Sequence, residues 1–241
     1  MEFTFHPLGD KAIQLQFSHE ISEETIQRIR AYSAFLKEAP IQGVIEWIPA
    51  YTTLTILYEP EVISYEQLKK KLEQIKGQTA FDSSSPIVYE IPTYYGGEFG
   101  PDLSYVAQYN NMTEKDVIKL HTSVDYLIYM MGFAPGFPYL GGMPNQIATP
   151  RLEQPRKKVS AGSVGIAGEQ TGIYPLDSPG GWRIIGKTPI KLYDPRLEQP
   201  ILLSPGHYLR FKSITFEEYA AIEKEVQHGT YQIKTYAKEE A

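Results

Sequence analysis

Three stretches rich in glycine and proline constrain the fold of this chain more than any other feature. They are GFAPGFPYLGGMP (132–144), SAGSVGIAGEQTGIYP (160–175) and SPGGWRIIGKTP (178–189). Disordered segments are poor in large apolar residues, but these stretches contain Phe133, Phe137, Tyr139, Tyr174 and Trp182. Glycine permits backbone geometry that other residues cannot adopt, and proline fixes it. The pattern therefore predicts either folded loops around a pocket or the well-packed turns of an all-β domain.

Composition limits the class of protein. The 241 residues suffice for one large or two small domains, and a hydrophobic content of 42% suffices for a core. The net charge of −6 argues against nucleic acid as a main partner. The absence of cysteine excludes disulfides and thiolate chemistry. The opening MEFTFHPLGDK does not read as a signal peptide, and no apolar run approaches about 18 residues. We therefore expect a cytoplasmic protein that does not span a membrane.

Residues 1–92 alternate between strand and helix patterns. The expected elements are a strand-like segment 3–17 broken by a turn at Leu8-Gly9-Asp10, a helix over 22–38, strands at 43–47 and 52–58, a helix from residue 64 and a strand at 87–91. The order β-α-β-β-α-β is typical of a ferredoxin-like domain. The polar segment QTAFDSSSP (78–86) is interpreted as an interdomain linker or as a loop leading into the last of these strands.

Residues 93–241 predict a second, β-rich domain. Short helices are expected at 101–110 and 113–121, and Thr113 with Asp116 resembles a capping box. The expected strands that follow are YLIYMM (126–131), SVGIAG (163–168), WRIIG (182–186), IKLYD (190–194) and HYLRFKSI (207–214). Short strands separated by glycine and proline indicate a barrel or a sandwich. A final helix is expected over 216–228.

The best-known catalytic signatures are absent from the sequence, including the phosphate loop GxxxxGK[ST], HExxH and GxSxG. The five histidines are scattered, so we expect no metal site. Arg151, Arg156 and Arg183 lie within or beside the glycine-rich stretches, and their guanidinium groups suit a carboxylate or phosphate. The alternative is that these arginines tie loops together through backbone carbonyls. Considered together with Ser163, Gln170 and Tyr174, they favour a polar pocket.

His121 ends a predicted helix just before the strand that leads into the first glycine-rich stretch. It would act either as a proton donor or acceptor near neutral pH or as a structural residue at the end of its helix. Ranked by chemistry and position, the catalytic candidates are His121, Arg156 and Tyr174. The candidates for substrate binding are Pro135, Gly136, Phe137, Arg151, Ser163, Gln170, Gly180, Gly181 and Trp182.

Four long motifs carry a resemblance to a known family. They are FHPLGDKAIQLQF (5–17), GFAPGFPYLGGMP (132–144), TPRLEQPRKKVSAGSVGIAGEQTGIYP (149–175) and SPGGWRIIGKTPIKLYDP (178–195). This set closely resembles the allophanate hydrolase subunit 1 family, also called the carboxyltransferase subdomain A/B family. Two positions depart from its usual pattern: Ser160 stands where members commonly have proline, and His207 where they commonly have aspartate.

The resemblance implies a fold and a set of partners. It implies an α+β chain, with a ferredoxin-like domain over 1–92 and a cyclophilin-like β-barrel over 93–241. It also implies a subunit 2-type carboxyltransferase-domain partner, which is the C subunit of 5-oxoprolinase, together with a lactam-utilisation-type A subunit. Members of the family include 5-oxoprolinase B subunits and an inhibitor of a sporulation histidine kinase.

The resemblance further implies a reaction, the opening of 5-oxo-L-proline to L-glutamate coupled to ATP hydrolysis. ATP, with Mg²⁺, is expected at the level of the complex, since this chain has no phosphate loop. One alternative is a purely regulatory protein that blocks autophosphorylation of a histidine kinase. Another is a scaffold for the subunit 2 partner, with no catalytic residue of its own.

Overall fold

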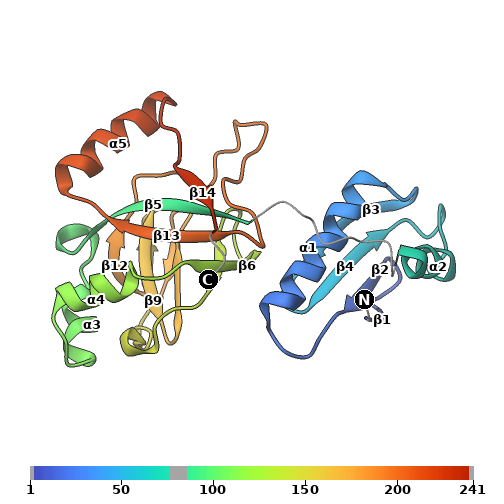
Figure 1. Cartoon of the computed structure of the whole chain (residues 1–241), viewed down its shortest axis with the longest axis horizontal. Coiled ribbons are helices and arrows are strands. Elements are labelled where there is room, and N and C mark those ends of the chain that lie inside the picture. The colour runs from blue at the N-terminus through green and yellow to red at the C-terminus, as the bar shows by residue number, and fades with distance from the viewer. Residues whose placement is uncertain (1–2, 76–85, 239–241) are drawn as a thin grey trace. The chain divides into compact units, whose positions relative to one another are not determined.

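The computed structural model describes residues 3–75 and 86–238, and each of these two ranges forms a compact unit of its own (Figure 1). Each unit has its own hydrophobic core. The sequence predicts a linker or loop over 78–86, and all of it except Pro86 lies outside the described residues.

The first unit is a four-stranded antiparallel sheet with two helices. Its elements are β1 (Thr4–Pro7), β2 (Ala12–Gln16), α1 (Glu23–Glu38), β3 (Val44–Pro49), β4 (Thr53–Tyr58) and α2 (Tyr65–Ile75). Ser22 caps α1 by accepting a hydrogen bond from the Thr25 amide. Tyr32 of α1 and Leu72 of α2 are completely buried in the same cluster as Leu54 of β4. Both helices therefore bury their apolar faces against the sheet.

The strand order of this sheet is β1-β2-β4-β3. The sequence places residues 87–91 in the first domain, but these residues pair elsewhere. The position beside β2 is occupied by β1, because the chain reverses at Gly9 with a φ of 64° and forms a hairpin. The β-α-β-β-α order from β2 onward is present. The name ferredoxin-like stays a prediction.

The second unit contains most of the strands. They are β5 (Ile87–Tyr95), β6 (Tyr126–Met131), β7 (Pro138–Gly141), β8 (Arg156–Val159), β9 (Ser163–Ala167), β10 (Gln170–Ile173), β11 (Ser178–Gly180), β12 (Arg183–Lys187), β13 (Tyr208–Ser213) and β14 (Thr235–Ala237). The helices are η1 (Gly97–Phe99), α3 (Leu103–Tyr109), α4 (Glu114–His121), η2 (Asn145–Ile147) and α5 (Phe216–His228). A capping box between Thr113 and Asp116 starts α4, as the sequence predicts.

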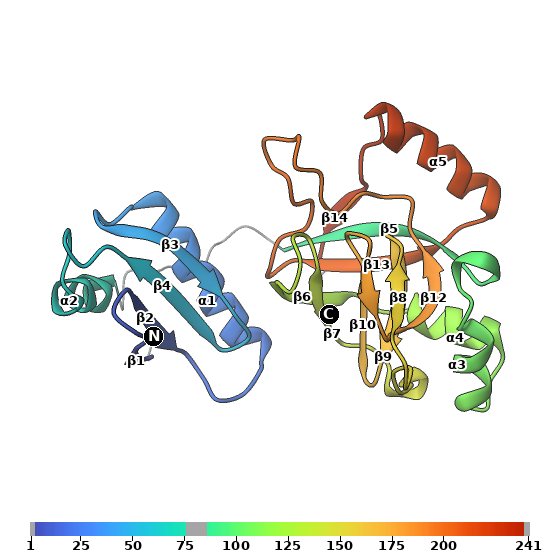
Figure 2. The same cartoon turned by 180° about the vertical axis from the view of Figure 1, so that it is seen from behind.

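Most of these strands form one large, nearly closed sheet. Its order is β10-β9-β12-β5-β13-β6-β7, with β14 also paired to β5. The two end strands, β7 and β10, lie against each other, so the sheet curls into a barrel (Figure 2). Strands β8 and β11 form a separate two-stranded ribbon. A β-barrel with few helices is thus confirmed, whereas the finer name cyclophilin-like stays a prediction.

Pairing of β5 explains where the second unit begins. This strand lies between β12 and β13 in the barrel sheet, and its parallel register with β13 runs from Val88 to Thr93. The boundary expected at 92/93 therefore falls inside β5. The strand expected at 190–194 is also absent: only an isolated bridge joins Tyr193 to Ile201, in a segment bounded by Pro189 and Pro195.

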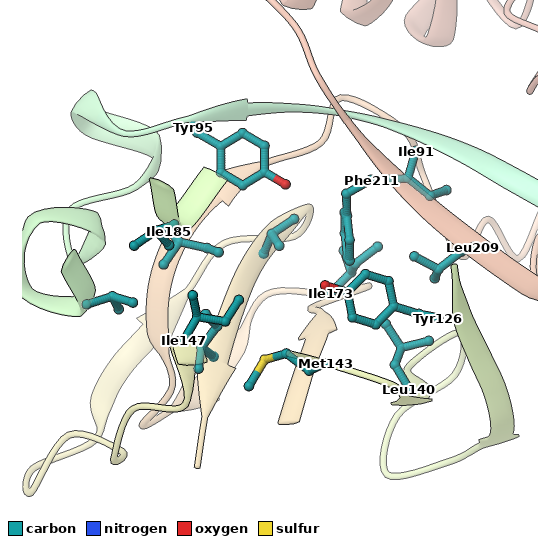
Figure 3. Close-up of a cluster of buried hydrophobic side chains, with 14 of the residues drawn as sticks. Ile91, Tyr95, Tyr126, Leu140, Met143, Ile147, Ile173, Ile185, Leu209 and Phe211 are labelled. Atoms are coloured by element: carbon teal, nitrogen blue, oxygen red, sulfur yellow. The ribbon is translucent and has the colours of Figure 1, made fainter. Parts of the chain in front are cut away.

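The barrel encloses a core of aliphatic and aromatic side chains. Figure 3 shows Ile91, Tyr95, Tyr126, Ile173 and Phe211 converging in this interior, together with residues from β7 and β12. The interior is therefore packed with apolar side chains from several of the described strands. None of the described helices is both long and apolar enough to cross a membrane.

Candidate functional site

A cavity of about 450 Å³ lies in the second unit, where the three glycine-rich stretches meet. It is lined by Phe133, Phe137, Tyr139, Arg151, Pro155, Gln170, Tyr174, Pro179, Gly180, Gly181 and Trp182. We call it the aromatic pocket. Its walls come from the β6–β7 loop and β7, the segment before β8, the two ends of β10, and β11 with its connection to β12. The volume lies in the range of small-molecule sites, about 300–1,000 Å³.

Aromatic rings build its inner wall. Phe137 is central: its ring centroid lies 5.9 Å from Tyr174 and 5.8 Å from Trp182, with both pairs close to perpendicular. Tyr174 and Trp182 are 6.1 Å apart and also edge-to-face. Phe137 and Tyr174 are almost fully buried. These contacts fix the rings relative to one another, so the wall is formed before any ligand arrives.

Two polar side chains in this pocket lack partners among the described residues. Arg151 makes no hydrogen bond or ion pair with any residue that the structure describes, and neither does the side chain of Gln170. The guanidinium offers several N–H donors in one plane, and the carboxamide offers both donors and an acceptor. An apolar wall with a free cation and a free amide suits a small, flat anion that carries an amide.

Tyr174 stays a neutral phenol in this wall. Burial raises its pKa above the usual value, and a backbone hydrogen bond with Trp182 and the charges of Arg151 and Arg156 oppose that shift. The tyrosine hydroxyl lies directly over Gly180, where a Cβ would overlap it. At the neighbouring Gly181 a Cβ would have its nearest neighbour at 3.6 Å, an ordinary contact. Gly180 is therefore needed for the position of Tyr174, and Gly181 is not.

The structure does not bring His121 into this pocket. His121 is completely buried at the end of α4, with Nδ1 2.7 Å from the Tyr95 hydroxyl and Nε2 2.8 Å from the Thr171 hydroxyl. Thr171 donates its hydrogen to the Gly165 carbonyl, so it accepts from His121 Nε2–H. Tyr95 then donates to Nδ1. Burial lowers the His121 pKa to about 3, which keeps the ring neutral.

Arg156 is held by a carboxylate. Its Nη2 lies 2.8 Å from both oxygens of the buried Asp102, and its Nη1 donates to the Trp182 carbonyl. The same carboxylate accepts from the Ile184 amide at 2.6 Å. This geometry fits the alternative in which an arginine ties loops together. Arg156 and Ser163 line a second cavity, of about 330 Å³.

Pro135 and Gly136 belong to the β6–β7 loop but do not line the aromatic pocket. Gly136 has a φ of 81°, and a Cβ there would come within 3.0 Å of the Leu192 carbonyl. Its role is therefore close packing of the loop. The pocket gathers Phe137, Arg151, Gln170, Tyr174, Gly180, Gly181 and Trp182 from the sequence-derived candidates.

Four residues that line the pocket are not among the sequence-derived candidates: Phe133, Tyr139, Pro155 and Pro179. Phe133 and Tyr139 belong to the aromatic set within the glycine-rich frame, and that pattern was the signal for them. Within 3–75 and 86–238, no group of three or more His, Asp or Glu side chains could hold a metal ion.

Comparison with known proteins identifies relatives over nearly the whole chain. The family model "Carboxyltransferase domain, subdomain C and D" matches residues 3–203. The B subunit of the 5-oxoprolinase of Bacillus subtilis (strain 168) is 43% identical over 236 residues, which cover 93% of this chain and 98% of that protein. The resemblance to a carboxyltransferase-domain family is thus confirmed, with subdomains C and D named in place of A and B.

Two solved structures are similar in fold. The crystal structure of TTHA0988 has a TM-score of 0.76 and 37% identity, and the match covers 85% of this chain but only 40% of that one. The Kluyveromyces lactis urea carboxylase has a TM-score of 0.75 over 98% of this chain and 24% of the enzyme, at 20% identity. In both, the matching part is one segment of a longer polypeptide.

Proposed function

This chain belongs to the family of carboxyltransferase-domain proteins with subdomains C and D, and we propose that it is the B subunit of an ATP-dependent 5-oxoprolinase. The observation that carries the proposal is the 43% identity to a B subunit of 5-oxoprolinase along almost the full length of both proteins. The proposed substrate is 5-oxo-L-proline, and the products are L-glutamate, ADP and phosphate.

The aromatic pocket supports this substrate class. 5-Oxo-L-proline is a small five-membered lactam that carries a carboxylate. We propose that the Arg151 guanidinium pairs with the carboxylate and that the Gln170 carboxamide pairs with the lactam amide. The rings of Phe137 and Trp182 would cover the apolar ring atoms. Tyr174, which is neutral, would serve as a hydrogen-bond donor.

The proposed reaction needs ATP because the lactam is a stable amide. The lactam oxygen attacks the γ-phosphorus of ATP, and ADP leaves. One water then adds to the activated ring carbon and the ring C–N bond breaks, which leaves the new carboxyl group as an acyl phosphate. A second water hydrolyses this acyl phosphate to L-glutamate and phosphate. The role of this chain would be to bind the lactam and orient it for these steps.

ATP and Mg²⁺ are assigned to the complex and not to this chain alone. The sequence lacks a phosphate loop, and no group of acidic and histidine side chains in the described parts fits a metal ion. The proposed partners are a C subunit of the subunit 2 type and a lactam-utilisation-type A subunit, with the complex in the cytoplasm. The longer TTHA0988 chain, of which this one matches 40%, is in keeping with a partner beside it.

The test is reconstitution. ATP hydrolysis and glutamate release that depend on 5-oxo-L-proline are measured with the A and C subunits, with and without this chain. We expect activity only when the chain is present. Arg151→Ala and Gln170→Ala should each raise KM about ten-fold, the effect of losing about 1.4 kcal/mol of binding. Arg196→Ala is the matched control, because Arg196 is exposed and pairs with Asp194 away from the pocket.

Normal KM values in both pocket variants would remove Arg151 and Gln170 from the substrate site. No activity from three folded, associated proteins would instead favour the regulatory alternative. The motifs resemble those of the Bacillus sporulation kinase inhibitor KipI, so the next assay would be autophosphorylation of a sporulation histidine kinase with and without this chain. Kinase inhibition stays a prediction from the sequence.

A further inference from the structure

Phe133 has an unusual backbone for an aromatic residue. Its φ is 63°, and Asn111 is the one other non-glycine position in the described chain with a positive value. Asparagine adopts this region readily, but a bulky residue there is strained. The Ala134 amide donates to the Gly132 carbonyl at 2.7 Å, which makes Phe133 the centre of a γ-turn. With positive φ this is the rare, strained form of that turn.

The loop around this turn is tightly closed. The Phe137 amide donates to the Ala134 carbonyl at 3.0 Å, and the Gly132 amide donates to the Phe137 carbonyl at 3.1 Å. These three bonds join the ends of β6 and β7 and fix the loop backbone. The position of Phe133 is therefore imposed by its surroundings, as is needed to maintain a strained conformation.

Core packing does not account for this strain. Phe133 is 74% exposed, the largest exposed fraction among the large hydrophobic residues of the described chain. Its ring meets Phe137 edge-to-face at 5.5 Å and lines the aromatic pocket. The backbone thus holds an apolar ring in solvent, at the mouth of a cavity whose inner wall is Phe137. A strained backbone that is not offset by burial of its side chain is typical of residues positioned for a ligand.

We propose that Phe133 is a ligand-contacting and specificity-determining residue of the aromatic pocket, whose ring covers a flat lactam or amide once it is bound. The inference rests on the proposed function for the identity of the ligand. Arg151 and Gln170 would hold the polar edge of that ligand, and Phe137 and Trp182 one apolar side. Phe133 would cover the other apolar side of the ligand and exclude water from that side. The ring is the part of the wall that ligand binding would bury most.

The test uses Trp182 as a reporter. The chain has two tryptophans, so Trp47→Phe leaves Trp182, which lines the pocket, as the only one. The chain in this background is labelled with fluorotryptophan and assembled with unlabelled partner subunits, so that the fluorine NMR signal reports Trp182 alone. The complex is titrated with 5-oxo-L-proline while this signal and turnover are followed. The variants are Phe133→Gly, Phe133→Ala and Phe133→Tyr. Tyr109→Ala is the control, because Tyr109 is a 51% exposed aromatic residue on α3 outside the pocket.

We expect Phe133→Gly and Phe133→Ala to raise both Kd and KM by about three- to ten-fold, the range of one lost aromatic contact. Phe133→Tyr and Tyr109→Ala should stay within about two-fold of the parent. Glycine removes the strain as well as the ring, so Phe133→Gly should melt at a higher temperature than Phe133→Ala. A merely structural role would instead lower the melting temperature in both and leave Kd unchanged.

Three results would overturn the inference. An active parent complex with unchanged Kd and KM in Phe133→Gly would show that the ring does not touch the ligand, while the proposed function stands. Failure of Phe133→Gly to assemble at concentrations that suffice for the parent would make Phe133 an anchor for a partner protein. A parent complex without turnover and without a Trp182 response would overturn the proposed function, and this inference with it.

Discussion

Strand β10 contributes neighbouring residues to two polar regions of the barrel unit. Thr171 lies in the interior, where it links His121 to the Gly165 carbonyl. Gln170, one residue earlier, lines the aromatic pocket and makes no side-chain hydrogen bond with the described residues. Successive side chains on a strand point to opposite faces, so one strand serves both regions. In the interior, His121 and Thr171 hydrogen-bond to each other and to further groups. In the pocket, the side chains of Gln170 and Arg151 have no hydrogen-bond partner among the described residues.

The two regions therefore have different roles: the paired groups of the interior support the stability of the fold, and the unpaired groups of the pocket are available to bind a ligand. A buried polar group that loses its partner costs the full desolvation of what remains, so each group in the interior network supports the fold. An exposed group without a partner contributes little to the fold and is free to meet a ligand. We therefore expect changes at His121 to affect unfolding and changes at the pocket to affect affinity.

The largest expected effect is that of His121→Ala. It leaves a cavity, removes the acceptor of the buried Tyr95 hydroxyl, and removes the donor to the buried Thr171 hydroxyl, which keeps only its bond to the Gly165 carbonyl. We expect a loss of about 4 kcal/mol in the free energy of unfolding, or about 10 °C in melting temperature. Differential scanning calorimetry measures it. His228→Ala, an exposed position at the end of α5, is the control. A normal melting temperature with abolished turnover would instead place His121 at the reacting atoms.

The next effect concerns pH. Burial lowers the pKa of His121 from 6.5 to about 3 in the folded state, so the unfolded chain binds the proton first as pH falls. The stability that the neutral, buried His121 contributes is fully present above about pH 6.5 and is lost as the pH falls towards about 3. The expected slope is about 1.4 kcal/mol per pH unit, or about 2 kcal/mol between pH 6 and 4.5.

Denaturant unfolding at several pH values measures that slope. His121→Ala should flatten it over the same window, because the variant has no proton to take up there. A parallel decline in the variant and the parent would show that other groups cause the acid sensitivity, and that the interior network does not.

Local patterns predicted much of this arrangement from the sequence. The capping residues Ser22 and Thr113 mark the starts of α1 and α4. Short strands between glycines and prolines indicate the barrel. The glycine-rich frame leads to Phe137, Tyr174 and Trp182, because these rings are close in sequence to the turns that position them.

Long-range pairing could not be predicted in the same way. His121 takes its partners from positions 26 residues earlier and 50 residues later, and Arg156 takes Asp102 from 54 residues earlier. Nothing local signals these contacts, so chemistry and position in the sequence rank both residues as catalytic candidates. The pairing of β5 with β13, from Val88 opposite Tyr208, likewise depends on distant parts of the chain, which is why the boundary falls before β5.

The smallest expected effect tests whether the pocket wall is preformed. Gly180→Ala places a Cβ against the Tyr174 hydroxyl, so the ring must shift. We expect a cost of about 1.5 kcal/mol in stability and a weaker affinity for 5-oxo-L-proline. Gly181→Ala is the matched control: it adds the same methyl to the neighbouring pocket residue, with its nearest neighbour at 3.6 Å.

Adding Tyr174→Phe to Gly180→Ala removes the overlapping oxygen and should recover part of the stability, although not the affinity, if the phenol donates to the ligand. Recovery of both would show that Tyr174 acts only through packing. Equal tolerance of alanine at positions 180 and 181 would show that the wall adjusts freely. The pocket would then be shaped by its ligand, and the contrast with the fixed interior around His121 would become sharper.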